Sequence, residues 1–522
     1  MDHATLVAAM RRPSFYDPPV EKVDFIQTHI SSVFLTGETA YKLKKPVNFG
    51  FLDFSTLELR EKFCRAEVDL NRRLAPDVYR GVEPIVRSGA RLAIGGDGET
   101  VDWVVVMRQM DEALHGIAVL ESGELAEHHI DQLVELLVPF YRNARTGAGV
   151  DEHGTLEAVR FNTNENFTQT EEYVGKLLSR RRYEHIRAWT SRFYEEQKEL
   201  FERRIEEGRI RESHGDLHLG NIFFEDPPII FDCIEFSERF RCGDVAADLA
   251  FLAMDLDFHG RPELSDLLIE RYVDASGDTG LPEMLDFYGC YRAYVRGKVS
   301  CFTATDPALG AGERRAQRNR ARHYFGLAYR YAGGSERPPL VVLHGLMGTG
   351  KTNIARHLRE THGWHVVSTD AVRKQISGVG EDTRVYVPYN AGLYSAEMNR
   401  RTYEEVCNRA ENLLRAGFPV AIDGAFKRER DRLPVIELAR RTDADLVFVE
   451  ATCAPAEQRR RLAERQIQDI RSDGRLEIME RQREEYEAPV QHLELHAKVS
   501  TDGPEEETQQ RAEELLRQRG LL

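Results

Sequence analysis

The pattern of hydrophobic and polar positions predicts helices across the middle of the chain and at its end. Between residues 125 and 145 apolar side chains recur at helical spacing, and similar patterns continue to about residue 330. Segment 502–522 is highly charged and keeps a narrow apolar stripe, which predicts a solvated terminal helix. The positions that carry these patterns are Ile130, Leu133, Leu136, Leu137, Phe140 and Tyr141, and then Ala512, Leu515 and Leu516.

The pattern changes at residues 331–339, "YAGGSERPP", where Gly, Ser, Pro and charged residues cluster as in a connecting segment. The residues that follow, "LVVLHG", form a short apolar run ending in glycine, which is typical of a buried parallel strand. We therefore predict two domains, residues 1–333 and 338–522, each able to fold alone. The second is expected to be a parallel sheet flanked by helices.

Composition narrows the classes of protein to consider. A chain of 522 residues exceeds what one hydrophobic core usually organises. Its 71 Lys and Arg against 87 Asp and Glu give a net charge of −16, which argues against broad binding to nucleic-acid phosphates. The seven scattered cysteines predict neither a zinc site nor a disulfide framework. No long apolar run or signal-peptide pattern is present, so we expect a soluble, cytoplasmic protein without membrane partners.

Residues 345–352, "GLMGTGKT", fit the pattern G-x-x-x-x-G-K-[ST] between an apolar strand and a helical segment. Glycines here let backbone N–H groups close around a β-phosphate at a helix N-terminus. Lys351 is expected to reach the β- and γ-phosphates, and Thr352 to bind Mg²⁺. The sequence therefore predicts an ATP-binding P-loop with its glycines at Gly345, Gly348 and Gly350.

Later strand ends carry candidate catalytic side chains. Asp370 follows a predicted strand and Arg373 comes one helical turn later, so that both face the same space. The aspartate can accept the proton of an attacking hydroxyl and the arginine can hold an anionic acceptor, although an N-cap aspartate beside a solvated arginine also fits. Asp423 ends the strand in "FPVAIDGAF" and is predicted to act on Mg²⁺ through water. Arg461 and Arg465 form either a lid over the transferred phosphate or a solvated basic face.

This segment resembles the group of P-loop kinases that includes polynucleotide 5′-hydroxyl kinases, gluconate-type kinases and zeta-toxin-like enzymes. The likeness runs from "GLMGTGKT" through "STDAVRKQI" and "AIDGAF" to the arginine-rich segment, over nearly all of residues 338–522. It implies the same roles for the residues just named: nucleotide binding at Lys351 and Thr352, the general base at Asp370, acceptor contact at Arg373, and a lid at Arg461 or Arg465.

A different set of polar residues lies in "HGDLHLGNIFF", residues 214–224, and in the "PPIIFD" that follows. Asp216 and Asn221 form H-x-D-x-x-x-x-N with His214, and Asp232 comes eleven residues after Asn221. A base aspartate and two metal ligands are the parts of a protein-kinase-like phosphotransferase. Asp216 is then the base, Asn221 and Asp232 hold Mg²⁺ on ATP, and His214 packs the loop. The alternative is an ordinary loop followed by a strand that an aspartate caps.

"HGDLHLGN" together with "DVAADLAFLAMDL" resembles the aminoglycoside phosphotransferase-like family over about residues 25–330. The resemblance implies a bilobal kinase fold, with a small lobe over about 25–108 and a large lobe over about 112–330. It also implies an ATP-anchoring lysine, which is Lys42 or its rival Lys44, a partner acid at Glu67, a hinge at 108–110 and a loop anchor at Asp248. No G-x-G-x-x-G loop precedes Lys42; "VFLTGET" has only Gly37.

The sequence as a whole predicts a bilobal protein-kinase-like domain followed by a P-loop domain. We expect a bifunctional, ATP- and Mg²⁺-dependent kinase that phosphorylates hydroxyl groups of small molecules at two separate sites. One alternative is a regulatory protein in which one nucleotide site is a switch. Another is a C-terminal domain that acts on nucleic-acid 5′-hydroxyl ends, which the net charge of −16 disfavours.

Overall fold

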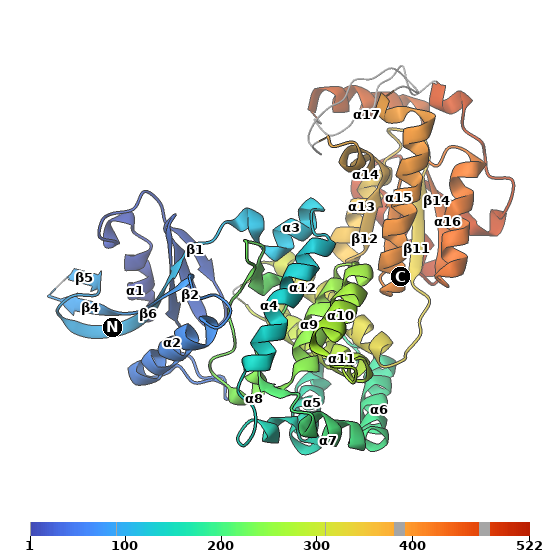
Figure 1. Cartoon of the computed structure of the whole chain (residues 1–522). Coiled ribbons are helices and arrows are strands. Elements are labelled where there is room, and N and C mark those ends of the chain that lie inside the picture. Colours follow the sequence, from blue (N-terminus) through green and yellow to red (C-terminus); the bar gives the residue numbers. More distant parts are fainter. Residues whose placement is uncertain (1, 90, 308, 380–391, 469–480) are drawn as a thin grey trace. The chain divides into compact units, whose positions relative to one another are not determined.

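The computed structural model describes residues 2–89, 91–307, 309–379, 392–468 and 481–522, with only the backbone for 465–468 (Figure 1). Contacts divide the chain into two compact units. Unit 1 consists of Met1–Thr168, Ala188–Leu256 and Glu263–Arg292, and unit 2 of Gln169–Arg187, Asp257–Pro262 and Ala293–Leu522. Among the described residues, no helix combines the length and the apolar character needed to cross a membrane.

Unit 1 begins with a six-stranded antiparallel sheet in the order β1-β2-β3-β6-β4-β5. Alternate residues of β6 enter two cores: Val104 packs with Leu6 of α1 on one face, and Val105 with Val68 of α2 on the other. The elements of this small lobe are α1 (His3–Met10), β1 (Asp24–Gln27), β2 (Ser31–Leu35), β3 (Thr39–Lys44), α2 (Leu57–Asn71), β4 (Tyr79–Ser88), β5 (Arg91–Ile94) and β6 (Glu99–Arg108).

The larger lobe of unit 1 is mainly helical. The helix predicted between residues 125 and 145 is α4, and its apolar stripe lies in the main core of the lobe. Two short antiparallel strand pairs lie at the 214–224 loop: β7, which pairs with β10, precedes it, and β8, which pairs with β9, lies near its end. The elements are α3 (Gly116–Ser122), α4 (Glu127–Asn143), α5 (Leu156–Thr170), α6 (Arg180–Glu196), α7 (Lys198–Glu206), β7 (Ile210–Glu212), β8 (Ile222–Phe223), β9 (Ile229–Ile230), α8 (Glu238–Arg241), β10 (Cys242–Asp244), α9 (Val245–Phe258), α10 (Pro262–Ser276) and α11 (Pro282–Ala304). The division into units assigns α6 as far as Arg187, and α11 from Ala293 onward, to unit 2.

Unit 2 contains a five-stranded parallel sheet in the order β12-β13-β11-β14-β15. Successive residues of β11 enter opposite cores: Leu340 packs on the side of α15 and α16, and Val341 on the side of α13 and α19. Burial on both faces explains the unbroken apolar run of "LVVLH". The elements are β11 (Pro339–His344), α13 (Lys351–His357), β12 (His365–Ser368), α14 (Thr369–Ile376), α15 (Ala396–Arg415), β13 (Val420–Asp423), α16 (Glu429–Arg441), β14 (Asp445–Thr452), α17 (Pro455–Gln468), β15 (His496–Ser500) and α19 (Glu505–Gln518).

Helix α12 (Ala311–Tyr331) also belongs to unit 2. Its Tyr324 stacks on Phe258 at 3.8 Å between ring centroids, and its His323 lies 5.2 Å from Phe418 and 5.5 Å from His365. Burial lowers the pKa of His323 to about 3 and that of His365 to about 4, so both imidazoles are neutral and pack as aromatic rings. Residues 331–339 thus lie within unit 2, and the predicted limits for independent folding stay a prediction.

Candidate active sites

The 214–224 loop of unit 1 is fixed by a buried carboxylate. Asp248 on α9 accepts hydrogen bonds from the backbone N–H groups of His214 at 2.7 Å and Gly215 at 3.0 Å. Gly215 has φ +86°, and a Cβ there would lie 2.8 Å from the carbonyl oxygen of Phe240, so the bend requires glycine. The sequence prediction that Asp248 anchors this loop is confirmed by these contacts.

Asp216 lies beside its predicted partner Asn221. The Asn221 Nδ2 donates to the Asp216 carbonyl at 2.9 Å and to its Oδ2 at 3.0 Å. His218 Nε2 lies 3.4 Å from the same Oδ2. Burial lowers the pKa of His214, so its ring is neutral, and its Nε2 lies 3.0 Å from the Phe231 carbonyl oxygen. His214 therefore packs the loop, while Asp216 remains about one-third exposed.

Asp232 comes just after β9 and has φ +62°, a backbone conformation that is rare for a residue with a side chain. Its N–H donates to the Tyr79 hydroxyl at 3.3 Å, and the next N–H, that of Cys233, donates to Asn71 Oδ1 at 2.8 Å. Its carboxylate contacts Lys42 Nζ. The two lobes of unit 1 thus meet at the predicted metal ligand.

The two lysines of β3 share one carboxylate. Lys42 Nζ lies 2.7 Å from Glu67 Oε1 and Lys44 Nζ 2.6 Å from Glu67 Oε2. Burial alone would raise the pKa of Glu67, but both lysines outweigh it and lower the pKa to about 2. Lys44 is fully buried and also contacts Glu235, whereas Lys42 is 12% exposed and reaches Asp232. The two candidate ATP-anchoring lysines therefore have different surroundings: Lys42 lies beside a predicted metal ligand, and Lys44 lies in the interior.

We predict that replacing Lys44 lowers the stability of the protein, whereas replacing Lys42 weakens its use of ATP. Lys44→Met leaves Glu67 and Glu235 buried with less compensating charge, so the free energy of unfolding of the N-terminal transition should fall by about 3–5 kcal/mol in urea. Lys42→Met should mainly raise the KM for ATP. If Lys44→Met instead weakened ATP binding at unchanged stability, Lys44 would be the nucleotide lysine.

The predicted hinge lies at the end of β6. Arg108 forms two hydrogen bonds to Glu225, at 2.9 and 2.8 Å. Gln109 donates its N–H to the Glu38 carbonyl at 2.9 Å and accepts a hydrogen bond from the Gly37 N–H at 2.9 Å. The β2–β3 turn lacks the glycine-rich sequence of protein kinases, and the backbone N–H and the side chain of Gln109 tie it to the hinge.

In unit 2 the P-loop joins β11 to α13. Gly345, Gly348 and Gly350 have φ of +125°, +76° and +88°. Added Cβ atoms would lie 2.8 Å from the Ala451 carbonyl oxygen at Gly345 and 2.9 Å from Leu462 at Gly348. Backbone conformation and lack of space therefore both require glycine at these positions.

The predicted nucleotide residues lie together on this loop. Lys351 Nζ donates to the carbonyl oxygens of Gly345 at 3.0 Å and Leu346 at 2.8 Å, which holds the ammonium over the loop. Thr352 Oγ1 donates to Asp423 Oδ2 at 2.8 Å. Because Asp423 ends β13 next to β11, the sheet brings the second predicted Mg²⁺ ligand to the first.

Asp370 and Arg373 lie one turn apart on α14, as the spacing predicts. Arg373 Nη1 donates to Asp370 Oδ1 at 2.9 Å, and its Nη2 donates to Asn399 Oδ1 at 3.2 Å. Its guanidinium also lies over the Tyr394 ring, 4.8 Å from the centroid. Arg373 is 7% exposed and Asp370 66% exposed, so a buried arginine orients an open carboxylate. This arrangement differs from an N-cap beside a solvated arginine.

Arg461 lies against the base of the P-loop. Its guanidinium donates to Thr501 Oγ1 at 3.0 Å and to the Thr501 carbonyl at 2.6 Å, while Thr501 Oγ1 donates to the Thr349 carbonyl at 2.7 Å. Its Nε donates to Glu457 at 2.8 Å. Arg465 lies on α17, and its side chain is outside the described residues. A lid role for either arginine stays a prediction.

Several residues of these sites were not predicted from the sequence. Glu235 follows Asp232 by only three residues, and it contacts Lys44. Asn399 and Tyr394 hold Arg373 from a segment with no recognisable motif. Thr501 closes the back of the P-loop from the end of β15. Of these residues, only Glu235 could have been suspected from the sequence, because it lies three residues after a predicted site residue, Asp232.

Two family models match the chain. That of the phosphotransferase enzyme family matches residues 96–287, which contain the 214–224 loop, and that of an AAA domain matches residues 340–489, which contain the P-loop. Kinases of these families use ATP, generally with Mg²⁺. The predicted fold class is confirmed: a bilobal protein-kinase-like domain is followed by a P-loop domain with a parallel sheet flanked by helices.

The chain is 34% identical over 436 residues to uncharacterized proteins of Mycobacterium tuberculosis and Mycobacterium bovis, and the match covers 83% of this chain and 84% of each relative. Among solved structures, it is similar to a gluconokinase from Sinorhizobium meliloti, with 18% identity over 35% of this chain and 96% of the other (TM-score 0.27). It is also similar to the GDP complex of aminoglycoside 2′-phosphotransferase-IIIa, with 12% identity over 63% and 98% of the two chains (TM-score 0.37).

Both matched domains are phosphotransferase or kinase domains, so the protein is an ATP-dependent kinase. By its identity over most of both chains, it belongs to the family of these mycobacterial proteins, with an N-terminal domain of the phosphotransferase enzyme family and a C-terminal AAA domain of the P-loop kinase group.

Proposed function

We propose that the protein transfers the γ-phosphate of ATP to hydroxyl groups of small molecules at two separate active sites, one in each compact unit. The observation that carries this proposal is the presence of a separate set of candidate residues in each compact unit. Each unit has its own candidate base, Asp216 or Asp370, and its own candidate phosphate-binding lysine, Lys42 or Lys351. Neither set borrows a residue from the other unit.

In unit 1, Asp216 accepts the proton of the acceptor hydroxyl as its oxygen attacks the γ-phosphorus. The new bond joins that oxygen to phosphorus, the bond to the bridging oxygen of ADP breaks, and ADP leaves with the electron pair. Asn221 supports this role because its amide donates to Asp216 Oδ2 at 3.0 Å and keeps the carboxylate in place. Lys42, which contacts both Glu67 and Asp232, is positioned to neutralise the ATP phosphates.

The residues present fit Mg²⁺ at both sites. In unit 1 the Asn221 amide nitrogen donates to Asp216, so its oxygen and the Asp232 carboxylate are the oxygen donors that would hold the ion. In unit 2 Thr352 and Asp423 bring two oxygens together. Oxygen donors of this kind are what Mg²⁺ prefers. When bound, the ion neutralises charge on the ATP phosphates and orients them for transfer.

In unit 2 we assign Asp370 as the base and Arg373 as the residue that holds it toward the acceptor. Asp370 is open to solvent, while Arg373 is buried and fixed by Asn399 and Tyr394. A carboxylate held by a fixed arginine can receive a proton in one defined place, which is what a general base requires. The P-loop supplies Lys351 for the β- and γ-phosphates.

The acceptor of unit 1 need not be a cation. In the acidic segment "EFSERF", residues 235–240, Glu235 contacts Lys44 and Glu238 lies 2.7 Å from Arg145. Both carboxylates therefore already face cations of the chain. An uncharged polyol or sugar-like alcohol fits this neutralised surface better than an amine does.

The test of two sites is an acceptor screen with the full chain and labelled ATP, covering sugars, nucleosides, amino alcohols and oligonucleotides. We expect at least two acceptor classes to be labelled, one lost in Asp216→Asn and another lost in Asp370→Asn. If one substitution abolished all labelling, the other site would not be a kinase site but a nucleotide switch. Labelling of oligonucleotide 5′-ends that depends on Asp370 would favour the polynucleotide kinase alternative.

A further inference from the structure

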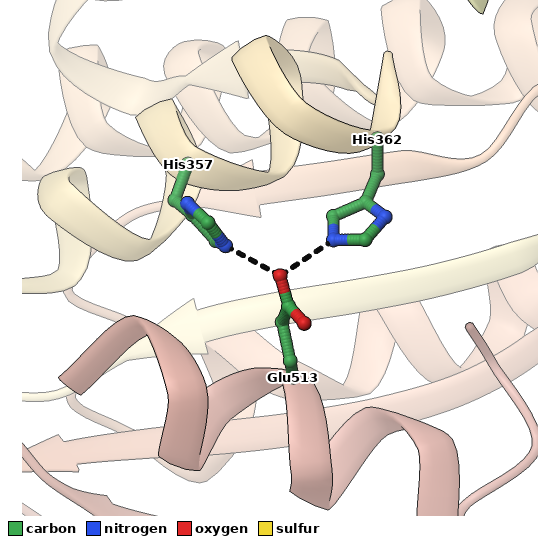
Figure 2. A group of neighbouring side chains, drawn as sticks. All are labelled: His357, His362 and Glu513. Atoms are coloured by element: carbon green, nitrogen blue, oxygen red, sulfur yellow. Dashed lines mark hydrogen bonds and ion pairs between the residues drawn. The ribbon is translucent and has the colours of Figure 1, made fainter. Parts of the chain in front are cut away.

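Three side chains outside both candidate active sites converge on one point in unit 2 (Figure 2). His357 is the last residue of α13, His362 follows five residues later, and Glu513 lies on α19. His357 Nε2 is 2.7 Å and His362 Nε2 2.9 Å from the same atom, Glu513 Oε1. The ligand atoms of all three residues lie within 4.8 Å of one another.

The helix geometry explains why both imidazoles face Glu513. In a regular α-helix, residues five apart point about 140° away from each other. Residues 358–362, "LRETH", instead form a π-helical turn, whose i→i+5 hydrogen bonding brings residues five apart onto one side. The unusual turn thus has a local effect: it aligns His357 with His362 on the face toward α19. Such turns are frequent at functional sites.

The surroundings of the cluster are those of a supported ligand set. The three side chains are 14%, 24% and 17% exposed, so they are shielded but reachable from solvent. Thr361 Oγ1 lies 3.2 Å from His357 Nδ1, and Arg517 contacts Glu513 Oε2. Outer contacts of this kind fix the ring and carboxylate orientations of metal ligands.

The cluster offers the donor atoms of a metal site. One carboxylate oxygen, Glu513 Oε1, lies at the two imidazole nitrogens, His357 Nε2 and His362 Nε2. An imidazole nitrogen and a carboxylate oxygen are common ligands of transition metals in proteins.

We propose that His357, His362 and Glu513 bind a divalent transition-metal ion of the Zn²⁺ kind, which fastens the P-loop helix α13 to the C-terminal helix α19. Two imidazoles and one carboxylate suit Zn²⁺, whereas Mg²⁺ prefers oxygen ligands alone. Ligand bonds of about 2.0–2.2 Å place tetrahedral ligand atoms roughly 3.3 Å apart. The two nitrogen–oxygen pairs, now 2.7 and 2.9 Å apart, therefore need to open by only about half an ångström around the ion, and water completes the fourth position.

The metal ion would stabilise the folded protein and would take no part in phosphoryl transfer. Helix α13 starts with Lys351 and Thr352 and ends at His357, so the metal would fix the far end of the helix that carries the nucleotide residues. An ion that binds only the folded state stabilises it according to its concentration relative to its Kd. The cysteine pattern predicted no zinc site, and this one uses no cysteine.

The experiment uses the full chain stripped of transition metals, in buffer with excess Mg²⁺. Titration with Zn²⁺ should show a site that raises the melting temperature, and Co²⁺ should give the intense visible absorption of a four-coordinate site with nitrogen ligands. In His362→Gln and Glu513→Gln we expect Zn²⁺ affinity at this site to fall at least about tenfold and the cobalt absorption to disappear. The matched control is Glu514→Gln, an exposed neighbour on α19, which should behave as the unaltered chain.

Two outcomes would overturn the proposal. One is a Zn²⁺ affinity that is the same in the unaltered chain, in both ligand variants and in the control, since the ion would then bind elsewhere. The other is the weak absorption of six-coordinate Co²⁺ with the unaltered chain, which shows a hydrogen-bonded cluster only. The second measurement needs no variant, so it decides the matter even if a substitution impairs folding.

Discussion

Asp216→Asn lowers kcat for the acceptor of the N-terminal site by about 10²-fold or more, while ATP binds with nearly unchanged affinity. The reason is that asparagine keeps the shape of the side chain and its contact with Asn221 but cannot accept a proton. The measurement is steady-state phosphorylation of the acceptor found in the screen, together with ATP binding by titration calorimetry in the Asp370→Asn background, which silences transfer at the other site.

The matched control for this variant is Asp274→Asn, an exposed aspartate on α10 that should leave kcat unchanged. Asp232→Ala provides the contrast: it should weaken metal-dependent nucleotide binding, because it removes a predicted metal ligand and a partner of Lys42. An Asp216→Asn enzyme with the kcat of the unaltered enzyme would show that Asp216 is not the base.

Asp370→Asn should abolish acceptor phosphorylation at the C-terminal site, with a loss of about 10²-fold or more, and should leave ATP affinity at the P-loop intact. Arg373→Ala should lower kcat for acceptor phosphorylation less than Asp370→Asn does, because the base remains but loses the arginine that orients it at 2.9 Å. Acceptor phosphorylation, ATP affinity and background hydrolysis are measured in the Asp216→Asn background.

This pair of variants separates a kinase from a switch, which Lys351→Ala cannot do, since it impairs nucleotide use in either case. A switch has no acceptor, so Asp370→Asn and Arg373→Ala would leave its slow hydrolysis unchanged. The matched control is Glu437→Gln, an exposed acid on α16. Retention of full acceptor phosphorylation by Asp370→Asn would contradict the mechanism proposed for unit 2.

Residues whose role is set by nearby sequence could be placed in advance. The P-loop glycines, the helix after them and the aspartates at strand ends follow from local pattern, because a turn or a strand end constrains only a few neighbouring residues. Lys42 and Lys44 are two residues apart, so alternation along a strand places them on one face, and the shared carboxylate of Glu67 agrees with this. What the alternation could not predict was the difference between the two lysines.

That difference depends on residues far away in the sequence. Glu235 lies 191 residues after Lys44 and Asp232 lies 190 after Lys42, and only the meeting of the two lobes assigns one acid to each. The cluster of His357 with His362 was hidden for another reason. Helical periodicity places residues five apart on different faces, so a π-helical turn cannot be read from a pattern of 3.6 residues per turn.

The packing of α12 in unit 2 limits where the coding sequence can be cut without separating contacts of the C-terminal unit. A fragment that begins at residue 338 keeps the parallel sheet but loses His323, which lies against Phe418 and His365. It also loses Asn319, whose side chain lies where a Cβ on Gly363 would clash. Recombination at the connector would therefore leave the rings of His365 and Phe418 without His323, whereas a break ahead of residue 293 would keep α12 with the sheet. The part of the chain that stays together as a folded unit at this end therefore begins before residue 338, where the segment with the P-loop motifs starts.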